Sequence, residues 1–149
     1  GHWLELGSTT TREQWSTAGS HNHPMFGGGL VWLYRKLAGM QADPDNPGYK
    51  HIIFQPQPVD ELQFVEYSNK TAYGLAGISW KNEDKRFTMK VTVPVGSEAT
   101  VYVPATGEQK VYESGKEVSK VSEIQFIEKQ ENFVLYKIGS GIYEFDVAR

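Results

Sequence analysis

A strict alternation of apolar and polar side chains, repeated in short runs after residue 49, limits the possible folds more than any other feature of this sequence. Over residues 87–93, Phe, Met, Val and Val alternate with Thr, Lys and Thr, as in a strand with one buried face. The same spacing returns at 101–103, 134–138 and 143–147, and turn residues separate the runs. The pattern predicts a mainly β chain, an antiparallel β-sandwich of about eight or nine strands.

The residues before this region predict a helix over 24–40. Apolar residues recur at a period of 3.6 at Phe26, Leu30, Leu33, Tyr34 and Leu37. Pro24 suits a first turn and Gly39 a C-terminal cap. We expect Trp32 and Tyr34 to lie in a core. A single helix cannot bury such a face by itself, so we expect it to need a partner.

Two shorter patterns lie around this helix. The threonines at 9–11, followed by Arg12 and Glu13, predict the start of a short helix with a threonine cap. The glycine run at 27–29 is costly inside a helix, so we expect another helix or a ligand to pack against its backbone. It lacks the spacing of a phosphate-binding loop.

The overall composition excludes several classes of function. The net charge of -3 argues against nucleic-acid binding. The absence of Cys excludes disulfides and thiolate metal sites. No apolar run is long enough to span a membrane. We therefore expect no cofactor, no metal, no nucleic acid and no membrane among the partners.

Residues 12–23 gather the side chains best suited to chemistry. Glu13 reads either as a solvated or capping carboxylate or as a general base or acid, with Trp15 as an apolar wall and Arg12 favouring the charged form. The segment His21-Asn22-His23 reads either as the entry of the following helix, with Asn22 or Ser20 as its cap, or as a polar rim that hydrogen-bonds the hydroxyls of a ligand. The two histidines around Asn22 are spaced two apart and lack a third ligand, which argues against zinc.

Two features of the β-rich half also have two readings. Residues 69–71, Asn-Lys-Thr, fit the N-glycosylation pattern, which has meaning in a eukaryotic host. Aromatic residues such as Trp80 either fill the core of the sandwich or bind sugar at its surface, and the core is the reading that we expect.

Taken jointly, the motifs resemble bacterial α-L-rhamnosidases of glycoside hydrolase family 78. GSTTTREQW at 7–15 and SHNHPMFGGGLVWLYRKLAGM at 20–40 resemble the end of the catalytic domain of that family. PDNPGYKHIIFQPQP at 44–58 resembles its link into a C-terminal β-sandwich. The resemblance implies two parts: residues 1–43, the end of an (α/α)6 barrel, and residues 44–149, the sandwich domain.

The resemblance also implies an activity for the parent enzyme, the release of terminal α-L-rhamnose with inversion. Glu13 then stands at the position of the general base, and His23 at that of a rhamnose-contacting histidine. Trp15, Arg12 and Asn22 line the substrate site. The partners would be a rhamnose-containing oligosaccharide or glycoside and the upstream part of the catalytic domain, where the general acid lies. The family has Trp where this chain has Arg12, which also fits a catalytically lapsed relative.

The first residue is Gly rather than Met, so we expect a fragment. We expect it to be inactive alone, because one carboxylate and part of a barrel cannot preorganise the transition state. Its apolar helix face would support self-association. The alternative function is a non-catalytic β-sandwich module that binds carbohydrate or docks another domain. The compartment stays open, with an exported parent favoured over a cytoplasmic one.

Overall fold

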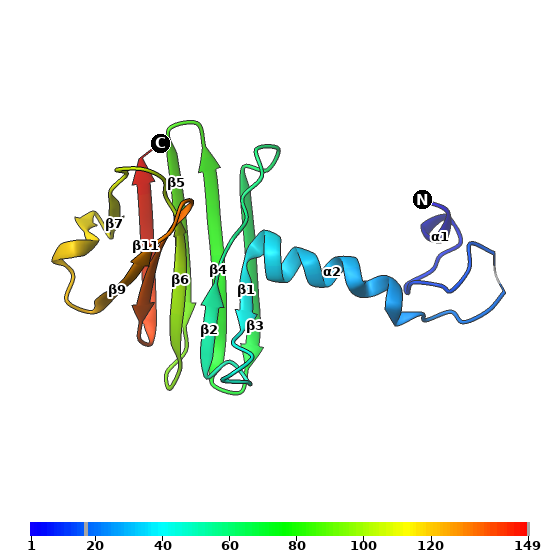
Figure 1. Ribbon diagram of the computed structural model, residues 1–149. Helices are drawn as coiled ribbons and strands as arrows, with labels where there is room; N and C mark the ends of the chain where they lie inside the picture. Colours follow the sequence, from blue (N-terminus) through cyan, green and yellow to red (C-terminus); the bar gives the residue numbers. More distant parts are fainter. Residues whose placement is uncertain (17, 149) are drawn as a thin grey trace. The chain divides into compact units, whose positions relative to one another are not determined.

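The computed structural model describes residues 1–16 and 18–148, and for Phe26 the main chain only (Figure 1). The chain divides into two compact units, Gly1–Leu33 and Tyr34–Arg149. The predicted division into the end of a catalytic domain, residues 1–43, and a sandwich domain, residues 44–149, stays a prediction.

The first unit is built from short helices and irregular chain. Its helices are α1 (His2–Glu5), the 3₁₀ turn η1 (Pro24–Gly27) and α2 (Gly28–Trp32). The short helix predicted to start at residues 9–11 is wrong, since residues 11–12 have no regular structure and residues 13–16 form bends. The reason is that the main-chain N–H of Glu13 bonds to the carbonyl oxygen of Ser20, a distant partner, instead of to a preceding turn.

The helix predicted over 24–40 is confirmed in place but changes type along its length. After α2, the chain continues as η2 (Leu33–Ala38), a π-helical turn, and ends at Gly39 with φ +85°. Gly39 is required there, because a Cβ would lie 2.2 Å from the main-chain N of Pro56. Met40, assigned to the helix by periodicity, instead begins the first strand.

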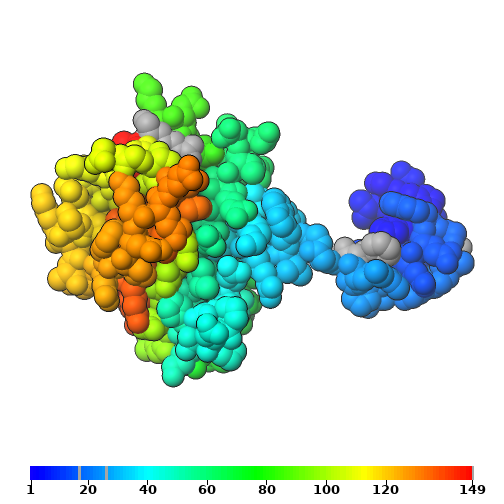
Figure 2. Space-filling view, in the orientation of Figure 1, coloured from blue at the N-terminus to red at the C-terminus, as the bar shows by residue number. Residues whose placement is uncertain are grey.

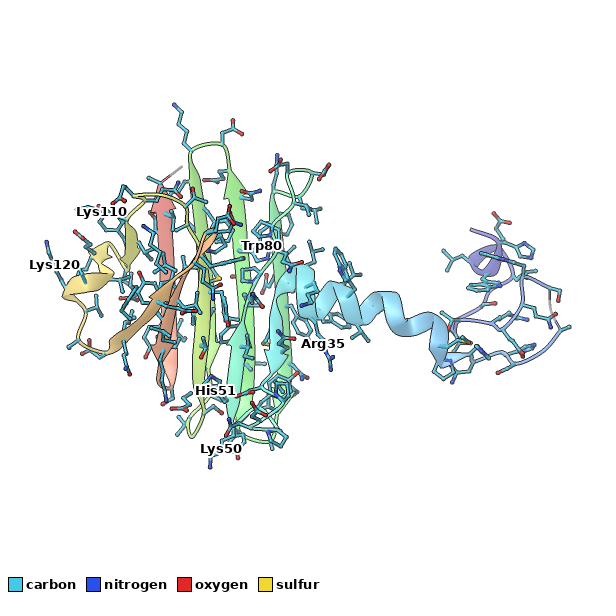
Figure 3. All side chains as sticks on the ribbon, viewed as in Figure 1. Arg35, Lys50, His51, Trp80, Lys110 and Lys120 are labelled. Atoms are coloured by element: carbon cyan, nitrogen blue, oxygen red, sulfur yellow. The ribbon has the colours of Figure 1, made fainter. Side chains whose placement is uncertain are left out.

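Two hydrogen bonds from other parts of the second unit hold the end of η2. The indole Nε1 of Trp80 donates to the carbonyl oxygen of Leu37 at 3.1 Å. The main-chain N–H of Gln57 donates to the carbonyl oxygen of Lys36 at 3.0 Å. Within the helix end itself, the main-chain N–H of Gly39 donates to the carbonyl oxygen of Tyr34 at 3.1 Å. Figure 3 labels Trp80 in the sandwich beside this helix end. The last carbonyls of the helix, which would otherwise lack partners, are thus satisfied.

The second unit is a two-sheet structure with eleven strands among the described residues. The five-stranded sheet has the order β1-β2-β6-β10-β9, with β1 (Met40–Ala42), β2 (His51–Phe54), β6 (Glu98–Pro104), β10 (Phe133–Ile138) and β9 (Ile124–Lys129). The six-stranded sheet has the order β3-β4-β5-β11-β7-β8, with β3 (Phe64–Thr71), β4 (Gly74–Glu83), β5 (Arg86–Val93), β11 (Gly141–Ala148), β7 (Val111–Glu113) and β8 (Lys116–Glu117). A 3₁₀ turn, η3 (Val118–Lys120), follows β8.

The mainly β fold is confirmed, with two differences in detail. The strand count exceeds the predicted eight or nine, since β1 and β8 are too short to show alternation. One pair, β2 with β6, is parallel, while the other strand pairs of the described residues are antiparallel. Tight hairpins join β3 to β4 and β4 to β5, so those registers follow from local sequence.

The core lies between the two sheets. The inward side chains include Phe54 and Val101 from one sheet and Trp80 and Phe87 from the other. Tyr136 of β10 stacks on Phe145 of β11 with ring centroids 6.0 Å apart, which is a direct contact between the sheets. The prediction that Trp80 belongs to the core is confirmed. Figure 2 shows orange atoms of β9 at the surface, where every residue of this strand after Ile124 is exposed.

One prediction about the helix is wrong, and the expected packing of a helix or a ligand against the glycine run stays a prediction. Trp32 is 50% exposed and Tyr34 is 44% exposed, although both were expected in a core. Tyr34 stacks on Tyr67 of β3 at 4.8 Å, and only the last turn, at Leu37 and Ala38, is buried. A Cβ at any of the glycines 27–29 would meet nothing within 4 Å, so no described residue packs against that backbone.

The helices of the described chain are all short. None has the length and hydropathy required to cross a bilayer.

Candidate functional site

The candidate site lies in the first unit, where two irregular segments, residues 11–13 and residues 20–23, run side by side. The N–H of Glu13 donates to the carbonyl oxygen of Ser20 at 2.9 Å. Closer to the helix, the N–H of His23 donates to the carbonyl oxygen of Thr11 at 2.7 Å, and the Thr11 hydroxyl donates back to the carbonyl oxygen of His23 at 3.1 Å. These bonds bring residues 11–13 beside residues 20–23, so the two sequence motifs form one local structure.

The carboxylate of Glu13 is held by main chain and remains exposed. Its Oε2 accepts the N–H of Ser20 at 3.0 Å. Gly19, at φ +76°, lies beneath it, and a Cβ there would be 2.9 Å from the same oxygen. A fixed carboxylate that is open to solvent can accept a proton from a water molecule, which is the geometry that a general base requires.

Arg12 is directed away from Glu13. Its Nε donates to the Ser8 hydroxyl at 2.8 Å, and its Nη1 lies 3.2 Å from Nε2 of His21. The ion pairs of the described residues include none between Arg12 and Glu13. The guanidinium therefore links the segment at Ser8 to the segment at His21. Its expected effect on the charge of Glu13 stays a prediction.

Trp15 lies in an aromatic pair that the sequence reading did not include. Its ring stacks on Trp3 with centroids 4.6 Å apart, and Trp3 Nε1 donates to the carbonyl oxygen of Gln14 at 3.2 Å. Trp15 is nevertheless 70% exposed. The pair presents a flat apolar surface to solvent. The signal for Trp3 was its residue type alone, because no periodicity connects it to Trp15.

Asn22 and His23 occupy the entry to η1. The Ser20 hydroxyl donates to the carbonyl oxygen of Asn22 at 3.0 Å, while the N–H of Asn22 donates to that hydroxyl at 3.2 Å. His23 is the N-cap residue of η1 and is half-buried, but its side chain makes no capping hydrogen bond there. The capping role expected for Asn22 or Ser20 is wrong, since His23 is the N-cap residue of η1, and the Ser20 hydroxyl instead bonds to the main chain of Asn22.

The site contains no arrangement suited to a metal. In the described residues, no three His, Asp or Glu side chains come together in a group that could hold an ion. The glycosylation pattern at Asn69 falls within β3, where the residue is half-buried and paired with Ala76 of β4. That placement differs from the exposed loop on which such sites are normally modified.

Comparison with known proteins gives consistent results across the chain. The family model described as the bacterial alpha-L-rhamnosidase C-terminal domain matches residues 39–118. An alpha-L-rhamnosidase from Alteromonas sp. is 33% identical over 113 residues, covering 68% of this chain and 12% of that protein.

Solved structures agree with these sequence matches. The alpha-L-rhamnosidase from Dictyoglumus thermophilum superposes with a TM-score of 0.81 at 34% identity, over 100% of this chain and 17% of that one. The structure of the Streptomyces avermitilis enzyme complexed with L-rhamnose has a TM-score of 0.77 at 23% identity, over 97% of this chain and 14% of that one, and supports the fold alone.

The chain thus spans between 12% and 17% of the length of these three relatives. The match of the family model covers more than half of the 149 residues. The chain therefore belongs to the family of bacterial α-L-rhamnosidase C-terminal domains.

Proposed function

We propose that this chain is part of an inverting α-L-rhamnosidase and that Glu13 is its general base. The observation that carries the proposal is the Glu13 carboxylate, which is fixed by the N–H of Ser20 and open to solvent. The α-L-rhamnosidase relatives support the substrate class. Residues 1–43 would belong to the catalytic domain and residues 44–149 to the sandwich.

Inversion places two carboxyl groups on opposite faces of the sugar. One protonates the leaving oxygen, and the other takes a proton from the attacking water, with about 6.5–9.5 Å between them. Glu13 fills the second role. The general acid would come from the upstream part of the catalytic domain. The isolated chain should therefore show no turnover, because one carboxylate cannot supply both proton transfers.

The side chains around Glu13 would bind the sugar. The exposed Trp15 face, stacked on Trp3, offers an apolar surface to the C–H face of a pyranose. His23 and Asn22 would hydrogen-bond sugar hydroxyls. Arg12, tied to Ser8 and His21, would hold the two segments in register. The apolar helix face would pack on other catalytic helices or, in the fragment, on a second copy.

The test compares Glu13→Gln with Glu5→Gln in the full-length enzyme, with an aryl α-L-rhamnoside as substrate. Glu5 is an exposed carboxylate of the same unit. Glu13→Gln should lower kcat by about 10²-fold or more, with KM nearly unchanged, and Glu5→Gln should have little effect. Equal rates for both variants would refute the role of Glu13. The isolated 149-residue chain should show no turnover. If it did show turnover, and Glu13→Gln abolished that turnover, the prediction that the isolated chain is inactive would be refuted.

A second pair of variants tests the position of the carboxylate. Gly19→Ala would place a Cβ against Glu13 Oε2, whereas Gly7→Ala has the same kind of positive φ, +69°, with nothing within 4 Å. Both should cost similar stability. Only Gly19→Ala should lower kcat, by about tenfold or more, since a small displacement of a base is expensive. A loss of kcat shared by both variants would indicate general backbone strain instead.

A further inference from the structure

The outer face of the six-stranded sheet carries a row of charged and polar side chains that the proposed function does not use. The register places Glu66 of β3 opposite Ser79 of β4, Ser79 opposite Lys90 of β5, and Lys90 opposite Glu144 of β11. Because alternate residues of these strands, such as Trp80, are buried, the row faces outward. The row therefore crosses four strands with its charges alternating around a small serine.

The neighbouring row has small side chains, which hollows the surface. Ser68 lies opposite Gly77, and Gly77 lies opposite Thr92. Gly77 has an ordinary backbone conformation, and a Cβ there would only touch its neighbours, at 3.6 Å from Ser68 Cβ and 3.9 Å from Thr92 Cβ. A Cβ at Gly77 would make ordinary contacts only, so a larger side chain there would fill the hollow without a steric conflict.

Two adjoining hollows result, and together they form a groove. One has a volume of about 240 Å³ and the other about 400 Å³, and Glu66, Ser79 and Lys90 line both. Phe64, 68% exposed, lies at the end of the first hollow, and Leu75, 53% exposed, at the end of the second. The groove has polar groups at its centre and an apolar side chain at each end.

The polar groups of the groove are free to bind a ligand. The side chains of Glu66, Lys90 and Glu144 take part in none of the ion pairs or hydrogen bonds described for residues 1–16 and 18–148. Glu66 and Lys90 are separated by two strand spacings, roughly 10 Å, with the Ser79 hydroxyl between them. That span accommodates a six-membered sugar ring whose hydroxyls both donate and accept hydrogen bonds.

We propose that this groove binds a short neutral oligosaccharide of two or three pyranose units. Carboxylates accept hydrogen bonds from sugar hydroxyls, the Lys90 ammonium donates to ring or hydroxyl oxygens, and Phe64 and Leu75 contact the C–H faces of the outer units. The residues that line the first hollow include two carboxylates, Glu66 and Glu144, and two ammonium groups, Lys90 and Lys81, so a neutral ligand fits better than an anion. The groove does not include Glu13, so sugar binding there can be tested separately from the proposed hydrolytic activity.

The test titrates the 149-residue chain with neutral di- and trisaccharides, one of them containing rhamnose, and follows amide chemical shifts. Saturable shifts should map to β3, β4 and β5 and reach half-saturation below about 20 mM, as expected for an open groove. Shifts confined to residues 11–23, or no saturation with any sugar, would overturn the proposal. Concentration-dependent broadening of the same strands without sugar would assign the face to a second copy instead.

Variants separate the groove from the rest of the surface. Gly77→Thr fills the floor at a position where a Cβ fits, and Lys90→Ala removes the donor; each should weaken binding by about tenfold. The controls are Gly139→Thr, at a glycine with open space around it, and Lys120→Ala, on an exposed lysine away from the groove. Thermal melting verifies folding. Unchanged affinity in Gly77→Thr, or equal losses in the controls, would refute the site, and Glu13→Gln should leave binding intact.

Discussion

The two units of this chain differ in what holds them together. Every apolar side chain described as buried lies at Leu37 or later, and most belong to the inner faces of the two sheets. In the first unit, Leu4, Trp15 and Leu30 are exposed, and the local structure depends on hydrogen bonds such as those between Thr11 and His23. The sandwich has a hydrophobic core of its own, whereas the first unit carries the candidate site residues and has no buried apolar side chain among its described residues.

This contrast indicates how the two regions contribute to a larger protein. Burial of apolar surface is the main source of folding free energy, so the sandwich can fold from its own residues. The first unit has too little buried surface for that and would gain stability by packing against the rest of a catalytic domain. Functional residues often lie on such segments, which are positioned by a scaffold.

The most severe test of this contrast compares two tryptophans. Trp80→Ala removes a fully buried ring and the donor to the carbonyl oxygen of Leu37, so it should destabilise the sandwich by about 3–5 kcal/mol. Trp15→Ala removes an exposed ring and should change the main unfolding transition by less than about 0.5 kcal/mol. Urea denaturation followed by far-UV CD measures both. Similar losses for the two variants would contradict the contrast.

The joint between helix and sandwich gives the next largest effect. Gly39→Ala should cost about 2–4 kcal/mol, because φ is +85° and a Cβ would overlap the main chain of Pro56. Gly28→Ala, at a helical position with open space, should be neutral or stabilising by up to about 1 kcal/mol. Thermal melting of the two variants tests this. A harmless Gly39→Ala would show that the anchored helix end is not needed for the fold.

The smallest effect is the acid sensitivity of an ion pair on the sandwich. The hydrogen bond from Lys137 Nζ, 2.8 Å from Glu98 Oε2, lowers the pKa of the Glu98 carboxyl below its ordinary value of 4.5, and His51 contributes to the same direction. A lowered pKa stabilises the fold above pH 4.5, and this contribution is lost as the pH falls through the folded-state value.

The pair is exposed, so the expected size is a few tenths of a kcal/mol. Urea unfolding at pH 7 and at pH 3 should show a smaller acid-induced loss in Glu98→Gln than in the unmodified chain. Lys137→Met should reproduce the result, because it removes the same bond. An identical pH dependence in all three proteins would show that the Glu98–Lys137 pair does not contribute to the acid sensitivity of the fold. His51, labelled in Figure 3, has its Nδ1 3.4 Å from Glu98 Oε1.

Local sequence predicted the parts of the fold that depend on local physics. The alternation at 87–93 identified β5, and Pro24 and Gly39 marked the ends of the helical segment correctly. The parallel pairing of β2 with β6 was not predictable, because it joins distant residues without a hairpin. The exposure of Trp32 was missed because periodicity indicates an apolar face but not whether a partner covers it.

The candidate site shows the same division. Residue types pointed to Glu13 and His23, but the pairing of Thr11 with His23 and the stacking of Trp3 on Trp15 are non-local. The direction of Arg12, toward Ser8 and His21, could not be read from its place beside Glu13. The general acid of the proposed mechanism is expected in an upstream part of the parent enzyme, so these residues could not identify it.

Chemical rescue of Glu13→Ala in the full-length enzyme is the most direct test of the central claim, that Glu13 is the general base. Removal of the base should nearly abolish hydrolysis of an activated aryl α-L-rhamnoside. Azide, a nucleophile that needs no deprotonation, should restore release of the aglycone and give a rhamnosyl azide of inverted configuration. Full hydrolysis without azide, or an azide product of retained configuration, would contradict the account.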